Sequence, residues 1–210
     1  RETLGSPLTL CIYNRDYENW RAYMSDGACD VSARTVTKVR PGHADLAGVI
    51  KFAQSDARNV LERASARETA IRVAAGSVFK QYLSALGVEI GGYVKEVCGV
   101  KDEGRYAFSE LSCAKKSGLG MLDAAAEKEA EEKVASLKTA GDTLMRGLGT
   151  ADYLTHERAT AASERSDVCA VFALEVIAEA VVAEILAKTI AERLGGDTVY
   201  EVVERYRALP

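Results

Sequence analysis

Two arginines flank the predicted start of a helix, where they could bind an oxyanion. Arg63 and Arg67 lie on either side of Ser65, and Ser65 with Glu68 has the S-x-x-E spacing of a helix capping box. Free N–H groups and the helix dipole favour an anion at such a start, and guanidinium groups bind phosphate or carboxylate through paired hydrogen bonds. The segment 62–69 therefore predicts either a structural cap alone or an oxyanion site.

Of the two histidines, His43 has the better position for proton transfer. It lies in the run RPGHADL at 40–46, where Pro and Gly favour a turn and Asp45 is close enough to orient the imidazole. Because imidazole titrates near neutral pH, His43 is a candidate general acid or base, and an ordinary surface histidine is the alternative. His156 has no partner nearby in its polar stretch, so we expect a surface residue there.

A third candidate group precedes the apolar run that begins at Val168. Arg165 and Asp167 stand directly before this run. They either cap the helix that follows or place an arginine and a carboxylate at a site.

Helical periodicity indicates the elements that must position these residues. The clearest is a helix over 65–86, which carries Ile71, Val78 and Tyr82 on one face and is followed by Gly87. Four more helices are expected: one near 17–24 after Asp16, one over 120–140, one over 173–194 ending at Gly195-Gly196, and a last short one over 199–206 that Asp197 or Thr198 caps.

Alternating apolar residues predict two strands, at 8–13 and 88–94. Residues 25–42 are expected to form a loop. Between Gly141 and Asp167 no element is evident, although compact domains seldom contain structureless loops longer than about 12–15 residues. That stretch is therefore either a functional loop or a place where the chain is discontinuous.

Composition limits the class of protein. The 210 residues are 48% apolar, enough for a folded domain, and 27 Lys and Arg against 31 Asp and Glu give a net charge of −4. An acidic chain of this kind argues against general binding to nucleic acid or to an anionic membrane. Acidic residues interrupt its most apolar stretch, so we expect no transmembrane segment.

Cysteine and histidine usage points to a reduced compartment and against a metal site. The five cysteines are scattered without a C-x-x-C pair, and there are only two histidines. We therefore expect a cytoplasmic protein without metal ligands. Because the first residue is Arg1 rather than Met, we also expect the protein to begin upstream.

Three longer runs resemble chorismate synthase. They are RPGHADL at 40–46, DARNVLERASARETAIRVAAG at 56–76 and ERSDVCAV at 164–171, and the similarity extends to 2–20, 140–145 and 195–206. The resemblance implies a lyase that converts 5-enolpyruvylshikimate 3-phosphate into chorismate and phosphate by 1,4-elimination with reduced FMN.

The resemblance also implies roles for individual residues. Arg63, Ala64 and Ser65 match a flavin-contacting stretch, and Arg165 matches another flavin-contacting arginine. His43 matches a histidine that protonates the reduced flavin, Asp167 matches an acid that assists proton transfer, and Arg67 is expected to bind substrate.

The implied fold is α+β, a β-α-β sandwich in which long helices, here 65–86 and 173–194, cover β-sheets. We expect one such domain over 1–210 and a homotetrameric assembly. The family's N-terminal block, with an early histidine and substrate-binding arginines, and a glycine-rich middle block have no counterpart in the sequence. The match jumps over the middle block near 144–149, so the sandwich is expected to be incomplete.

Smaller departures are Ala64 where serine is usual, Ala53 where glycine is usual and Phe172 where proline is usual. Two interpretations follow: the chain is either part of a longer enzyme or a short relative that kept the scaffold of the family. In the second case, the chain would be a non-catalytic assembly or interaction protein that binds a partner through the apolar face of helix 173–194. A simple phosphate-binding module at Arg63, Ser65 and Arg67 is a third hypothesis.

Overall fold

The structure is a computed structural model of the 210-residue chain and describes residues 3–25, 27, 31–141, 147–162 and 168–210. The chain forms two compact units. Unit 1 comprises Arg1–Leu10, Ala70–Thr143 and Val168–Pro210, and unit 2 comprises Cys11–Thr69 and Leu144–Asp167.

Unit 2 combines short helices with one β-hairpin. Its elements are α1 (Tyr17–Met24), the 3₁₀ helix η1 (Ser32–Arg34), α2 (Asp45–Lys51), α3 (Arg58–Leu61), β3 (Gly149–Ala151) and β4 (Arg158–Thr160). The two strands pair antiparallel, and Lys38 forms a bridge to Asp152 beside them. A small core holds the unit together, made of Val36, Val39, Val49, Ala57 and Leu61.

Helices α2 and α3 pack closely because Gly48 has no side chain. A Cβ at Gly48 would lie 2.4 Å from Val60 Cγ1, so any larger residue would push the two helices apart. This contact matters for the site, since α2 follows the turn with His43 and α3 begins at Arg58.

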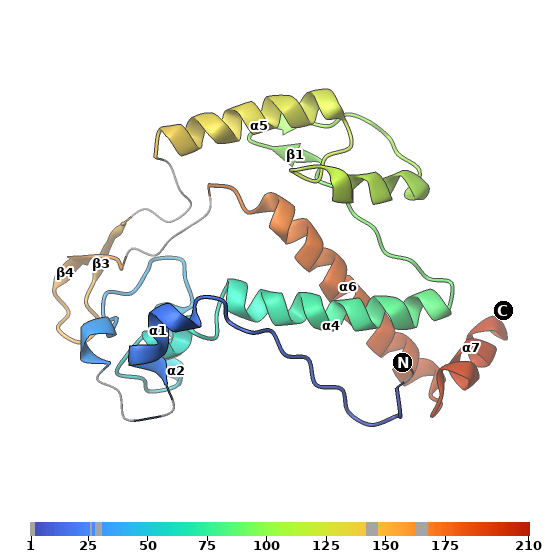
Figure 1. Ribbon diagram of the computed structural model, residues 1–210, viewed down its shortest axis with the longest axis horizontal. Coiled ribbons are helices and arrows are strands. Elements are labelled where there is room, and N and C mark those ends of the chain that lie inside the picture. The colour runs from blue at the N-terminus through green and yellow to red at the C-terminus, as the bar shows by residue number, and fades with distance from the viewer. Residues whose placement is uncertain (1–2, 26, 28–30, 142–146, 163–167) are drawn as a thin grey trace. The chain divides into compact units, whose positions relative to one another are not determined.

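Unit 1 is built around two long helices (Figure 1). Helix α4 (Ala66–Ala85) begins in unit 2 and continues through unit 1, where α6 (Val171–Leu194) crosses it. The crossing is close, since a Cβ at Gly76 would lie 2.4 Å from Ala180 Cβ. The other elements are β1 (Glu96–Val97), β2 (Val100–Lys101), the 3₁₀ helix η2 (Phe108–Lys116), α5 (Ala124–Thr139) and α7 (Val199–Arg207).

Apolar side chains form two clusters in unit 1. One joins α4 to α6 through Leu83, Ala183 and Ala187, with Phe79, Tyr82, Val88, Ile90 and Ile190 at its border. The other lies between the β1–β2 hairpin and α5 and comprises Val94, Val97, Val100, Leu119, Met121, Ala126 and Ala130.

A buried carboxylate fixes the connection between the β1–β2 hairpin and α5. Asp102 is fully buried and accepts hydrogen bonds from Gly104 N at 2.9 Å and the Tyr106 hydroxyl at 2.7 Å. It also accepts from Leu122 N at 3.2 Å and Asp123 N at 2.9 Å. Burial by itself would raise the pKa of Asp102, but these four donors bring it below its ordinary value, and the carboxylate raises the pKa of Tyr106 to about 12.

Replacing Asp102 with alanine is expected to destabilise the protein by about 3 kcal/mol, because several buried donors lose their acceptor. Folding lowers the pKa of Asp102. The carboxylate therefore stabilises the folded protein fully at a pH above its ordinary pKa of about 3.9, and this stabilisation is lost as the pH falls through the pKa of the folded state. The variant should therefore lose less stability than the wild type between neutral pH and pH ~3. Urea unfolding at several pH values measures both effects.

Exposed Asp197, also in unit 1, provides the matched control. Its replacement by asparagine should leave the unfolding free energy within about 0.5 kcal/mol of the wild type. An Asp102→Ala variant as stable as this control would contradict the assigned role.

The helix predictions are confirmed. Helices α1, α4, α5, α6 and α7 lie where periodicity expects them, at 17–24, 65–86, 120–140, 173–194 and 199–206. Gly195, with φ 61°, follows α6, and Thr198 caps α7 by accepting a hydrogen bond from Glu201 N at 3.3 Å. The loop at 25–42 contains only η1 and the Lys38 bridge among its described residues.

Both strand predictions are wrong. Residues 8–13 belong to no strand, and Leu8 and Ile12 are more than half exposed. In segment 88–94, Gly92 N donates to Glu179 Oε1 at 2.7 Å and Val94 N donates to Gly120 O at 2.8 Å. These N–H groups therefore have partners outside any strand ladder, and the pairing occurs further on, in β1 and β2.

The mixed α and β content agrees with the predicted α+β class. The sheets differ from the expected sandwich, because the described residues contain two sheets of two strands each. Helices α4 and α6 pack against each other rather than over a broad sheet. The hairpin β3–β4 occupies part of the stretch 141–167, where no element was evident.

Candidate functional site

The conformation of the RPGHADL turn depends on the buried carboxylate of Asp45. Asp45 is the first residue of α2 and is fully buried. Its Oδ2 accepts from Arg40 N at 3.0 Å and from Arg40 Nε at 2.9 Å, and its Oδ1 accepts from Arg40 Nη2 at 3.1 Å and is hydrogen-bonded to His43 Nδ1. The fork of Arg40 and the ring of His43 are therefore held by one carboxylate.

The charge state of Asp45 follows from this pairing. Burial alone would raise its pKa, but the Arg40 side-chain and backbone hydrogen bonds, the Arg40 charge and His43 bring the pKa below its ordinary value. Asp45 is thus an anion at neutral pH. When His43 Nδ1–H donates to this anion, Nε2 is the nitrogen that can accept or release a proton.

The Arg40 guanidinium also lies directly against the imidazole. Arg40 Nη2 is 3.0 Å from His43 Nδ1 and 3.2 Å from Nε2. The side chains of Arg40 and His43 are only 10% and 17% exposed, so the ring is held in place on several sides.

These side chains face the start of α4 across a small pocket of about 170 Å³. The pocket is lined by Arg40, His43, Arg58, Leu61, Ala64, Ser65, Ala66 and Arg67. Three guanidinium groups and one imidazole therefore share one concave surface with the first residues of a 20-residue helix. Cationic side chains at the start of a helix are a combination that favours an oxyanion.

The backbone at the start of α4 differs from an ordinary cap. Ser65 has a φ of +54°, in the left-handed region, whereas a capping residue usually has an extended backbone. The Ser65 carbonyl accepts the Thr69 N–H at 3.0 Å and the Thr69 hydroxyl at 3.1 Å. The strained turn places Ser65 on the pocket wall, and such strain is often found at functional sites.

A carboxylate competes for one of the pocket arginines. Arg67 Nε lies 3.0 Å from Glu62 Oε2. The second oxygen, Glu62 Oε1, is buried and has no hydrogen-bond partner among the described residues. Glu62 therefore competes with an incoming anion for the Arg67 guanidinium.

Replacing Glu62 with glutamine is expected to strengthen the binding of inorganic phosphate about threefold, because Arg67 no longer has an anionic partner to leave. Isothermal titration calorimetry at constant ionic strength measures this change. Glu157→Gln removes the same charge at an exposed residue of the hairpin and should leave the affinity unchanged. Equal affinities for both variants would exclude Glu62 as a competitor.

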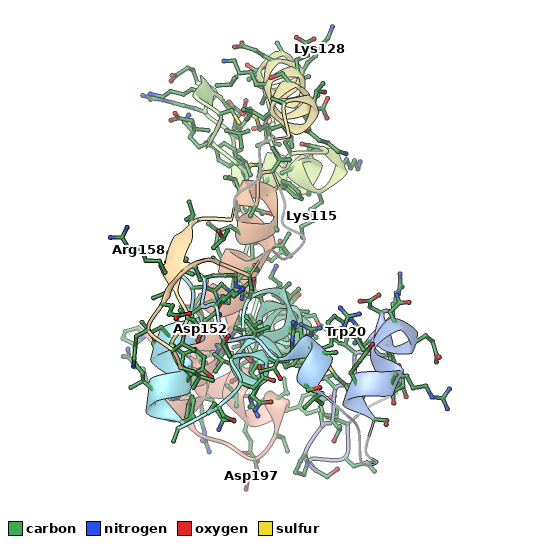
Figure 2. All side chains as sticks on the ribbon, turned by 90° about the vertical axis from the view of Figure 1, so that its left-hand side faces the viewer. Trp20, Lys115, Lys128, Asp152, Arg158 and Asp197 are labelled. Atoms are coloured by element: carbon green, nitrogen blue, oxygen red, sulfur yellow. The ribbon has the colours of Figure 1, made fainter. Side chains whose placement is uncertain are left out.

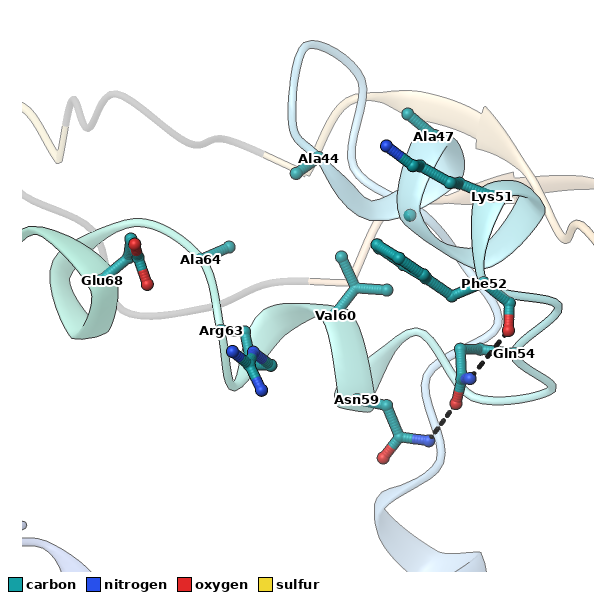
Figure 3. A pocket seen from close by; sticks show the side chains of 11 residues that line it. Ala44, Ala47, Lys51, Phe52, Gln54, Asn59, Val60, Arg63, Ala64 and Glu68 are labelled. Carbon is teal, nitrogen blue, oxygen red and sulfur yellow. Dashed lines mark hydrogen bonds between the residues drawn. The ribbon is translucent and has the colours of Figure 1, made fainter.

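Arg63 lines a larger pocket on the other side of Ala64. This pocket has a volume of about 860 Å³, and Ala64 borders both pockets. Figure 3 shows Arg63 and Lys51 as its cations, with the Phe52 ring beside Val60. Phe52 is 62% exposed, so an aromatic face is open to a ligand there.

The candidate residues therefore divide into three sets. His43, Ser65 and Arg67 meet at the small pocket, and Arg63 lies at the larger one. Arg165 and Asp167 lie outside the described residues. His156 is exposed in a turn of the β3–β4 hairpin, in agreement with the expectation of a surface residue.

Sequence reasoning assigned no role to Arg40 or Arg58, although both line the small pocket. For Arg40 a signal existed, because the i to i+5 spacing to Asp45 across a Pro-Gly turn allows a bidentate ion pair. Arg58 offered no local signal, since it reaches the pocket only through the packing of α3.

Comparison with known proteins places this arrangement in a family. The family model described as chorismate synthase matches residues 1–145. The chain belongs to the chorismate synthase family. The resemblance noted in the sequence is thereby confirmed.

Curated chorismate synthases from several bacteria are similar to this chain. The one from Syntrophotalea carbinolica is 35% identical over 99% of this chain and 80% of its own length. The one from Caldicellulosiruptor bescii is 30% identical over 99% of this chain and 82% of its own. The one from Geobacter sulfurreducens is 47% identical over 68% of this chain, which is only 37% of its own length.

A solved crystal structure of chorismate synthase shares the fold. It superposes with a TM-score of 0.58 at 26% identity, covering 78% of this chain and 75% of that chain.

The relatives are longer within the matched region. The alignment with the S. carbinolica protein runs over 311 residues, against 210 in this chain, so the relative contains positions that have no counterpart here. The family-model match ends at residue 145. A discontinuity near 144–149 stays a prediction, because residues 142–146 lie outside the described part of the chain.

None of the helices in the described part of the chain has the length and apolar character needed to cross a bilayer.

Proposed function

We propose that this protein catalyses the chorismate synthase reaction, in which 5-enolpyruvylshikimate 3-phosphate loses phosphate by 1,4-elimination and becomes chorismate, with reduced FMN as cofactor. The observation that carries the proposal is the small pocket, where three arginines and His43 face the start of α4. Family membership supports the same lyase activity. The comparisons do not favour the alternative of a non-catalytic scaffold.

The small pocket suits one anionic group of the substrate. The substrate contains a phosphate ester and two carboxylates, and a volume of about 170 Å³ accommodates one such group rather than the whole molecule. Arg67 and Arg58 would bind it by charge-assisted hydrogen bonds. The same guanidinium groups would stabilise the negative charge that develops as phosphate leaves.

His43 would hold and transfer the proton that the cycle requires. Asp45 fixes its ring through Nδ1, so Nε2, which lies 3.2 Å from Arg40 Nη2, would exchange the proton when that contact opens. Asp167 is proposed to assist this transfer.

The larger pocket would hold the flavin mononucleotide. Arg63 and Lys51 would bind its phosphate, the exposed Phe52 ring offers a face for an aromatic ring system, and Ala64 leaves room beside both. Ser65 and Arg165 are proposed to contribute further contacts. When bound, the reduced flavin lends electron density to the carbon skeleton as phosphate departs.

Assembly belongs to the same proposal. We propose a homotetramer whose subunits adopt the family's β-α-β sandwich, and we place the enzyme in the cytoplasm. Light scattering coupled to size exclusion tests the assembly, with an expected mass of about four chains. A monomer at micromolar concentration would contradict it.

The reaction itself is tested by anaerobic incubation of the protein with 5-enolpyruvylshikimate 3-phosphate and reduced FMN. We expect chorismate and phosphate in equal amounts, and no product when FMN is omitted. Quenching of flavin fluorescence measures cofactor binding separately. A protein that neither binds FMN nor forms chorismate would refute the proposed function.

A further inference from the structure

Helix α1 attaches to unit 2 without a buried side chain. None of its residues is buried. Asp16, directly before the helix, accepts hydrogen bonds from Asn19 Nδ2 at 2.7 Å and from Trp20 Nε1 at 2.8 Å. The indole of Trp20, which is labelled in Figure 2, is thus fixed at its N–H edge.

Two arginines lie over this indole. Arg34 Cζ is 5.0 Å from the centre of the Trp20 ring, and Arg58 Cζ is 5.1 Å from it. Both distances are within the range of cation–π attraction. Arg34 also lies 4.9 Å from the ring of Tyr23, so α1 presents two aromatic rings to a pair of guanidinium groups.

Arg58 connects this stack to the small pocket. Its backbone N–H donates to Asp56 Oδ1 at 2.8 Å, its Nε donates to Arg34 O at 3.4 Å, and its side chain lines the pocket with His43 and Arg67. An arginine side chain has many rotamers, so its direction must be set by what it packs against. One of its partners is Trp20, whose helix contributes no residue to the pocket lining.

The geometry points to Trp20 as a positioning residue for Arg58: its indole holds the Arg58 guanidinium toward the small pocket, so that α1 contributes indirectly to anion binding. This inference rests on the proposed function, because it assumes that the small pocket binds an anionic group of the substrate. It adds that the contact between Trp20 and Arg58 sets the affinity of the pocket for the anion. Tyr23 contacts Arg34 and not Arg58, so it should have no effect on that affinity.

A double-mutant cycle tests the inference with inorganic phosphate as the probe. Its dissociation constant is measured by calorimetry on the full chain at constant ionic strength for Trp20→Leu, Arg58→Gln and the double variant. Trp20→Leu should weaken binding about fivefold, whereas Trp20→Phe, which keeps an aromatic face, should stay within about twofold of the wild type. The double variant should bind no more weakly than Arg58→Gln, because Trp20 acts through Arg58.

Tyr23→Leu is the matched control, since it removes an aromatic ring from the same helix without touching Arg58. Its affinity should equal that of the wild type. Independent, additive losses in the double variant, or an equal loss in Tyr23→Leu, would overturn the inference.

A second measurement does not depend on the folding of any Trp20 variant. Trp20 is the chain's only tryptophan, so its emission reports on surroundings that include Arg34 and Arg58. Phosphate should change the wild-type emission with the calorimetric dissociation constant, chloride at equal ionic strength should not, and Arg58→Gln should abolish the change. An emission unchanged at saturating phosphate would overturn the inference.

Variants of Arg67 and Trp20 distinguish the anion pocket from the positioning role. If Arg67→Gln loses phosphate binding while Trp20→Leu retains it, only the positioning role falls. If the wild type binds no phosphate, the positioning role falls together with the proposed anion pocket.

Discussion

Replacing His43 with alanine is expected to lower kcat about 10²–10⁴-fold, because the pocket loses the group that exchanges the proton. The dissociation constant of FMN should stay within about threefold of the wild-type value, since the larger pocket does not include His43. Steady-state chorismate formation and flavin fluorescence measure the two quantities on one preparation.

His156→Ala serves as the control for this variant. His156 is exposed on the hairpin and lines neither pocket. Its replacement should leave kcat unchanged. A parallel loss of turnover and FMN affinity in His43→Ala would make His43 a structural residue rather than a proton carrier.

Replacing Asp45 with asparagine should lower turnover at least about 100-fold and destabilise the fold by about 3 kcal/mol. The variant leaves the charge of Arg40 without its buried partner and releases the His43 ring. Turnover and the free energy of unfolding in urea are the two measurements.

A compensating change separates the two effects of Asp45→Asn. Adding Arg40→Gln removes the unpaired cation, so the double variant should regain most of the lost stability, while turnover stays low because the imidazole is still not oriented. Recovery of turnover together with stability would show that Asp45 acts only through the fold.

Helix predictions succeeded where the sequence contains its own start and stop signals. Thr198 and Glu201 define the beginning of α7, and Gly195 ends α6. Helical periodicity requires no partner, so α4 could be recognised locally. Helix α2 gave a weaker signal because it is short and has Gly48 at its centre.

Strand predictions failed because a strand is defined by its neighbour. Segment 88–94 is apolar enough for a strand. The N–H of Gly92, however, donates to Glu179, which lies far away in the sequence. The opposite error occurred at β3 and β4, whose residues Gly-Thr-Ala and Arg-Ala-Thr lack an alternating apolar pattern. Tertiary contacts decided both cases.

The parts of the site that depend on residues close together in the sequence could be predicted. The pairing of His43 with Asp45 follows from two residues of separation, and the arginines at the start of α4 follow from the helix itself. Arg63 lines one pocket and Arg67 the other because of the turn at Ser65. No sequence pattern predicted the positive φ of Ser65. The position of Arg58 in the lining of the small pocket depends on how α3 packs against α2.

The most direct test of the account is a crystal structure of the protein with 5-enolpyruvylshikimate 3-phosphate and FMN. We predict an anionic group of the substrate in the small pocket, with its oxygens about 2.7–2.9 Å from guanidinium nitrogens of Arg58 and Arg67. His43 should face the bound ligands, and the flavin phosphate should lie at Arg63 and Lys51. Density for both ligands at another surface, with these five side chains turned to solvent, would contradict the account.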